Sequence, residues 1–140
     1  MTELRQLLYI SRAAPELSPM GLRQLLSDAS RKNWRQQVTG CLLYTGRAFA
    51  QVLEGEGEVV RGLAGRIATH PWHQDLRVLF DRPVDRRHYP AWSMGYVYSL
   101  DLADRLDQLW AAGTVSDGDI ASLLALLRPD PVMGPLDGAP

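Results

Sequence analysis

The stretch Phe49-Ala50-Gln51-Val52-Leu53-Glu54-Gly55 decides how the rest of the chain can fold. It is rich in β-compatible residues and stops at a glycine, which predicts a strand. Alternation places Phe49, Gln51 and Leu53 on one face of that strand, and the two residues between them on the other. Gln51 is therefore a primary amide among apolar neighbours. Because an unpaired buried amide costs roughly 1–3 kcal/mol, we expect a polar group over that face.

Four more strands and two helices surround this stretch. Alternation and turn residues predict strands at Leu4–Ser11, Val38–Thr45, Leu76–Phe80 and Ser93–Tyr98. Apolar residues at helical spacing predict one helix from an N-cap at Ser18 to about Asn33, and a second at Glu56–His70. The order β-α-β-β-α-β-β predicts an α+β, ferredoxin-like sandwich, in which a mixed five-stranded sheet carries both helices on one face.

The topology brings two polar side chains together. In this fold we expect the first and third strands to be parallel neighbours at the centre of the sheet. Adjacent strands lie about 5 Å apart, so the phenol of Tyr9 and the amide of Gln51 can touch if both project toward the helices.

The C-terminal third of the chain predicts two further amphipathic helices. They cover Asp101–Trp110 and Ser116–Leu127, and Ser116 with Asp119 is a candidate N-cap pair. We expect these helices to cover the opposite face of the sheet. The Pro- and Gly-rich end predicts a flexible tail. The chain thus divides into a core domain of residues 1–98, a helical extension of residues 99–128 and a tail of residues 129–140.

Composition excludes several classes of protein. The formal net charge of the 140 residues is −1, which gives no bias toward nucleic acid or membrane surfaces. We expect no membrane span and no signal peptide. Cys41, the single cysteine, excludes an intrachain disulfide and fits a reducing cytosol, so we expect a cytoplasmic protein.

Metal and enzyme motifs are missing from the sequence. His70, His73 and His88 have no matching cysteine or carboxylate cluster at ligand spacing, so we expect no metal. The sequence carries no nucleophile motif and no glycine-rich phosphate loop. The residues themselves therefore give no motif for an enzyme.

The order and spacing of several motifs in this sequence resemble those of the BLUF photoreceptors. These are small blue-light sensors that hold a flavin noncovalently. The matching segments are Leu8–Ser11, Asn33 with Val38–Tyr44, Phe49–Gly55, Arg66-Ile67 with Pro71 and His73 following, and Trp92–Gly95. The resemblance covers roughly residues 4–98. The C-terminal helices resemble those of the short, stand-alone members.

The resemblance implies roles for individual residues. Tyr9 would donate an electron and a proton to the photoexcited flavin, and Gln51 would bridge Tyr9 and the flavin N5/O4 edge. Asn33 would hydrogen-bond the O4/N3 edge, and Lys32 would lie along the ring. Arg66 would face a phosphate of the cofactor tail.

Four other positions follow from the same resemblance. Ser11 and His70 are further cofactor-binding candidates, although His70 departs from the aspartate that several relatives have there. Trp92 and Met94 match the pair that carries the signal outward along the fifth strand. The sequence leaves open which of these two faces the flavin.

The implied cofactor is a flavin, FAD before FMN or riboflavin. Rearrangement of Gln51 would red-shift the flavin and signal through the fifth strand and the C-terminal helices, to an unidentified protein or through a homodimer. The resemblance implies a photoreceptor that turns over no substrate. A photoadduct with Cys41 is the weaker alternative to a packed strand cysteine. An acylphosphatase-like hydrolase using Arg12 and Asn33, and a light-insensitive sensing or interaction module, remain as alternatives.

Overall fold

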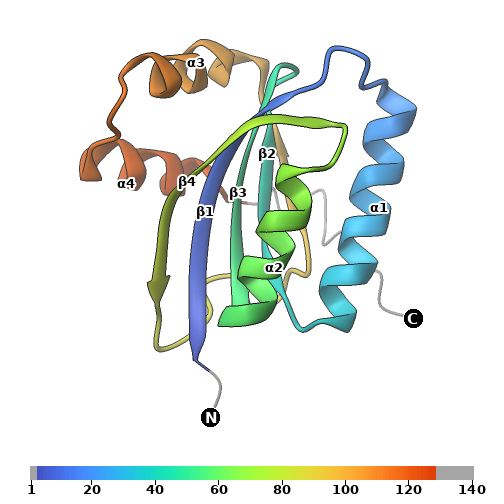
Figure 1. Ribbon diagram of the computed structural model, residues 1–140, viewed down its shortest axis with the longest axis vertical. Helices are drawn as coiled ribbons and strands as arrows, with labels where there is room; N and C mark the ends of the chain where they lie inside the picture. The colour runs from blue at the N-terminus through green and yellow to red at the C-terminus, as the bar shows by residue number, and fades with distance from the viewer. Residues whose placement is uncertain (1–2, 129–140) are drawn as a thin grey trace.

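Five strands form a single mixed sheet in the computed structural model, which describes residues 3–128 (Figure 1). The strands are β1 (Leu4–Ala13), β2 (Thr39–Tyr44), β3 (Ala48–Glu56), β4 (His73–Pro83) and β5 (Gly95–Tyr98), and their spatial order is β4-β1-β3-β2-β5. β5 runs parallel to β2, whereas the other three pairs are antiparallel. The ferredoxin-like prediction with one added strand is confirmed.

Helices cover both faces of this sheet. α1 (Pro19–Arg35) and α2 (Gly57–Ala68) lie on one face, and a short 3-10 turn, η1 (Leu100–Leu102), leads into α3 (Ala103–Ala111) and α4 (Asp117–Leu126) on the other (Figure 1). No helix among residues 3–128 is long and apolar enough to cross a bilayer. The segment 129–140, expected to be a flexible tail, lies outside the described residues.

Two N-caps follow the sequence closely. The side chain of Ser18 accepts a hydrogen bond from the backbone N–H of Gly21 at the start of α1. At the start of α4, Ser116 and Asp119 bond each other's backbone N–H groups in a capping box, as their spacing predicts.

The expected direction of the two central strands is wrong. β1 and β3 are antiparallel, with Tyr9 directly opposite Gln51. The crossover through α1 makes β1 parallel to β2, and the hairpin reverses β3 relative to β2, so β3 must oppose both of its neighbours. The predicted contact between the Tyr9 and Gln51 side chains is still possible in the antiparallel arrangement, because directly opposed residues have Cβ atoms about 5 Å apart.

The two faces of β1 and β3 carry separate apolar clusters. Leu8, Ile10, Ala50 and Val52 are fully buried beneath the C-terminal helices, as alternation predicts. The main partners from α3 and α4 are Leu106, Leu109, Trp110 and Leu123. Each of β1 and β3 is thus buried on both sides, which makes any polar side chain on them exceptional.

The loop between β4 and β5, residues 84–94, is held to the rest of the structure by buried hydrogen bonds. Glu54 is fully buried, and its carboxylate accepts hydrogen bonds from Gln6 Nε2 and from the backbone N–H groups of His88 and Tyr89, all at 2.8–2.9 Å. Arg87 donates to the backbone carbonyl of Glu54 at 2.9 Å. The phenol of Tyr89 donates to the carbonyl of Leu127 at 2.8 Å, which connects this loop to the end of α4.

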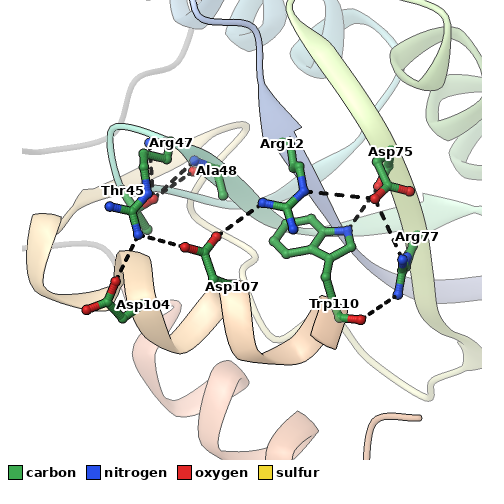
Figure 2. Close-up of polar contacts among 9 residues, drawn as sticks. All are labelled: Arg12, Thr45, Arg47, Ala48, Asp75, Arg77, Asp104, Asp107 and Trp110. Carbon is green, nitrogen blue, oxygen red and sulfur yellow. Dashed lines mark hydrogen bonds and ion pairs between the residues drawn. The ribbon is translucent and has the colours of Figure 1, made fainter. Parts of the chain in front are cut away.

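Helix α3 is fixed to one end of the sheet by charged side chains (Figure 2). The guanidinium of Arg12 lies 4.3 Å from the centre of the Trp110 ring and donates to Asp107 at 3.2 Å. Arg47, from the β2–β3 turn, donates to both Asp104 and Asp107 at 2.9 and 2.7 Å. The indole of Trp110 in turn donates to the carbonyl of Asp75 at 3.2 Å.

Replacing Arg12 with methionine keeps an unbranched stem over Trp110 and removes the charge. We expect Arg12→Met to lower the free energy of unfolding by about 1 kcal/mol at low ionic strength, since both the cation–π contact and the partly exposed ion pair are lost. Salt screens the ion pair, so the difference should shrink in 1 M NaCl. Urea unfolding followed by circular dichroism measures it. Arg86→Met, at an exposed loop position, is the control; an equal loss there would contradict the assignment.

Candidate functional site

A cavity of about 770 Å³ lies between α1, α2 and the sheet face that carries Tyr9 and Gln51. Its walls are mostly apolar, and the principal apolar side chains are those of Leu25, Leu26, Ala29, Leu42, Leu63 and Ile67. Of its polar residues, Tyr9, Gln51, Asn33 and His73 are buried, whereas the basic residues Lys32, Arg66 and His70 are exposed at the helices. Gln24, Asp28 and Gln36, on α1 and at its C-terminal end, also line the cavity.

The floor of the cavity holds a buried hydrogen-bonded chain of three side chains. The phenol of Tyr9 donates to Gln51 Oε1, and Gln51 Nε2 donates to the thioether sulfur of Met94 at 3.2 Å. All three residues are at most 2% exposed. Burial raises the pKa of Tyr9 above its usual value, so the phenol stays protonated at neutral pH. The amide is thus held between one donor and one weak acceptor.

Asn33 connects the cavity wall to the segment before β5. Its side-chain Nδ2 donates to the backbone carbonyl of Ser93 at 2.9 Å, and its own backbone carbonyl accepts from Val38 N–H at 2.8 Å. It is 2% exposed, although it lies near the end of a largely exposed helix.

His73 is a site residue that the resemblance used only as a landmark. It lines the cavity at the start of β4, and its Nδ1 lies 2.8 Å from the hydroxyl of Ser11. Burial and the neighbouring His70 lower the pKa of His73 to about 4, so its imidazole is neutral at pH 7. Its ring also lies 4.7 Å from the Phe49 ring, centre to centre. Phe49 lies on the same face of β3 as Gln51. The sequence therefore placed this neighbour of His73 on the cavity side of the sheet, but it did not place His73 itself.

The structure brings together most of the expected site residues. Seven of them line the cavity: Tyr9, Lys32, Asn33, Gln51, Arg66, His70 and Met94. Ser11 is fully buried and reaches the cavity only through His73. Trp92 does not line it; this half-buried side chain lines a second hollow between the β4–β5 loop and α4. Of the strand-5 pair, Met94 is the one that contacts Gln51.

Two other candidates are placed elsewhere. Cys41 belongs to the cluster under α3 and α4, on the face of the sheet opposite the cavity, and burial raises its thiol pKa to about 12. It cannot reach a ring bound beside Gln51. Arg12 is engaged by Asp107 and Trp110 of α3 and does not join Asn33. Among residues 3–128, no group of three or more histidine, cysteine or acidic residues could hold a metal ion.

The arrangement suits a flat, mostly apolar ring with polar atoms along one edge. Such a ring would lie among aliphatic side chains, and its polar edge would meet the buried amides of Gln51 and Asn33. The site has an oxidisable phenol hydrogen-bonded to a group that can both donate and accept. The hydroxyl of Ser11 is paired with the His73 imidazole, but Ser11 is fully buried and does not line the cavity, so this pair does not present a nucleophile to a bound molecule.

The cavity on this fold suits a flavin-sized ring, and comparison with known proteins gives the class of protein. The profile of the family described as BLUF, sensors of blue light using FAD, matches residues 4–95. The protein belongs to this family, whose domains bind flavin, and its matched region is a BLUF blue-light photoreceptor domain.

Individual relatives agree with this assignment. Photoactivated adenylate cyclase subunit beta of Euglena gracilis is 36% identical over 94 residues, which are 66% of this chain and only 11% of that protein. BlsA in its ground state matches with a TM-score of 0.76 and 26% identity over 91% of this chain and 89% of that one. BlrB in its dark state matches with a TM-score of 0.73 and 31% identity, over 88% and 93%.

The buried imidazole predicts a stability change in mild acid. In the unfolded chain His73 takes up a proton near its ordinary pKa of 6.5, whereas in the folded chain it does so only near pH 4. Its contribution to stability is therefore lost as pH falls from 6.5 to 4, by about 3 kcal/mol. We expect His73→Gln to show a correspondingly flatter pH dependence of the free energy of unfolding.

Urea titrations between pH 7 and pH 4 measure this difference. His88→Gln, at an exposed histidine, is the matched control and should follow the unmodified protein. The assignment is wrong if His73→Gln and the unmodified protein lose stability in parallel over this range.

Proposed function

We propose that this protein senses blue light by a rearrangement of Gln51 next to a flavin held noncovalently between α1 and α2. The observation that carries the proposal is the buried hydrogen bond from the Tyr9 phenol to the Gln51 amide, on the floor of an apolar cavity. A flavin fits the residues present: aliphatic walls suit the ring, buried amides suit its polar edge, and basic side chains suit an anionic tail.

When bound and excited by blue light, the flavin supplies an acceptor for one electron. Tyr9 gives up this electron, and its phenolic proton leaves along the hydrogen bond toward Gln51. Because burial raises the pKa of the phenol, the proton stays on Tyr9 until the electron departs. Both are then returned to Tyr9, so no substrate is consumed and no net oxidation remains.

Gln51 is the group whose arrangement stays changed after the electron and the proton have returned to Tyr9. Rotation or a change of tautomer exchanges the donor and acceptor positions of its amide, so the hydrogen bonds to Tyr9, to Met94 and to the ring edge must change together. The altered bonds red-shift the flavin absorption. They persist until the amide returns to its original arrangement.

FAD is the flavin we assign to the site, in agreement with the description of the family. Arg66 in the last turn of α2 and His70 just beyond it are the exposed basic residues that would meet phosphates. FMN and riboflavin offer the same ring and would support the same photochemistry. Asn33 and Lys32 would contact the ring itself.

The signal would leave through β5 and the C-terminal helices toward a partner protein or a second copy of the chain. Met94 contacts Gln51, and the β4–β5 loop before it is bonded to the end of α4 through Tyr89. Loop and helix can therefore respond to the same change. A two-state shift there could be recognised by a partner.

The visible spectrum before and after blue light tests the proposal. The unmodified protein should bind flavin and show a small red shift that decays in the dark. Tyr9→Phe should keep the flavin and abolish the shift, because the phenyl ring has no proton to give. Tyr98→Phe, at a half-exposed tyrosine of β5, is the control and should shift normally. An unmodified protein that binds flavin and bleaches, or does not respond, would contradict the mechanism.

A further inference from the structure

Helix α1 is joined to the rest of the molecule in an unusual way. It has 17 residues, yet its only buried residues are Ser30 and Asn33. Its apolar side chains, at Leu22, Leu25, Leu26 and Ala29, are only partly buried, and three of them line the cavity. Most helices are held to a sheet by a buried apolar stripe. The stripe of α1 packs in part against a buried cluster of the sheet, and the cavity lies beneath much of it.

Both buried residues of α1 bond to the same residue. The hydroxyls of Ser30 and Ser93 lie 3.1 Å apart, and Asn33 Nδ2 donates to the backbone carbonyl of Ser93 at 2.9 Å. Ser30 and Asn33 are three residues apart, so they lie on one face of the helix. We refer to Ser30, Asn33 and Ser93 as the serine clamp. All three are at most 6% exposed.

The serine clamp lies directly beside the photoactive chain. Ser93 precedes Met94, whose sulfur accepts the hydrogen bond from the Gln51 amide. β5 begins only at Gly95, and its pairing with β2 starts there. The carbonyl of Trp92 also accepts a hydrogen bond from the backbone N–H of Gly40 at 3.0 Å. Between these two backbone anchors, the side-chain contacts with α1 and Gln51 set the positions of Ser93 and Met94.

We propose that Ser30 is a positioning residue for the Gln51 switch, acting through Ser93 to hold the Met94 sulfur against the amide. The inference rests on the proposed function. It adds a second route by which a change at Gln51 is transmitted, into α1, beside the route through β5 and the C-terminal helices. When Gln51 withdraws its N–H from Met94, the polar side-chain contacts that remain on this segment are those of the serine clamp, and they return Met94 to its place. The same hydroxyl pair fastens α1 over the cavity.

Removing the Ser30 hydroxyl should slow the return to the dark state. One neutral hydrogen bond is worth about fivefold in an equilibrium or a rate. We expect Ser30→Ala to retain flavin and the light-induced red shift, and to recover in the dark about fivefold more slowly. Ser30→Thr restores a hydroxyl and should recover near the unmodified rate. Ser27→Ala, at an exposed serine of the same helix, is the matched control.

Unchanged or faster recovery in Ser30→Ala overturns the proposal, as does a Ser30→Thr variant that recovers as slowly as Ser30→Ala. If Ser30→Ala fails to fold or to hold flavin, the double variant Ser30→Ala/Ser93→Ala carries the test, because it leaves no unpaired buried hydroxyl. It too should recover more slowly, and recovery at the unmodified rate would overturn the proposal.

A second measurement separates this inference from the proposed function. Dissociation of flavin in complete darkness needs no photochemistry, and a loosened α1 should release it about fivefold faster in Ser30→Ala than in Ser27→Ala. If the unmodified protein shows no red shift, the proposed function fails, and the dark dissociation rates still decide whether the serine clamp holds α1. Equal rates would show that it does not.

Discussion

The site depends on one of the buried polar contacts of the central strands, the hydrogen bond between Tyr9 and Gln51. β1 and β3 are buried on both faces, so neither side chain can be satisfied by bulk water. Each therefore needs a partner in the fold, and the antiparallel register places them directly opposite each other. Met94 supplies a soft acceptor for the remaining amide hydrogen. A weak acceptor at this position leaves the amide easier to rearrange than a carboxylate would.

The two faces of the sheet have different tasks. On one face a continuous apolar cluster under α3 and α4 gives the domain its stable core, and charged side chains around Arg12 fix α3 to the sheet edge. On the other face α1 lies across a cavity; its two buried polar residues bond to Ser93, and its partly buried apolar side chains pack beside the cavity against Leu42, Phe49 and Met94. Stability and ligand binding are thereby separated, so the site side can adjust without loosening the core.

Much of the fold was predictable because its signals are local. Alternation in the Gln51 strand assigned both faces correctly, and the spacing of Ser116 and Asp119 predicted the capping box. The succession of elements predicted that the first and third strands are neighbours at the centre of the sheet. The direction of β3 relative to β1 was wrong, since it depends on the crossover as a whole. The length of β4 and the anchoring of the following loop by Glu54 were also missed, because those contacts join residues far apart in sequence.

The sequence by itself determined which residues could carry the chemistry: a phenol and an amide on neighbouring strands, in the motif order of the BLUF family. Only the tertiary structure decided that Met94 faces Gln51 while Trp92 lies outside the cavity, that Cys41 is on the opposite face, and that Ser30 bonds to Ser93. The reason is physical. Periodicity assigns a side chain to a face within one element, whereas pairs separated by more than 40 residues are fixed by how the elements pack.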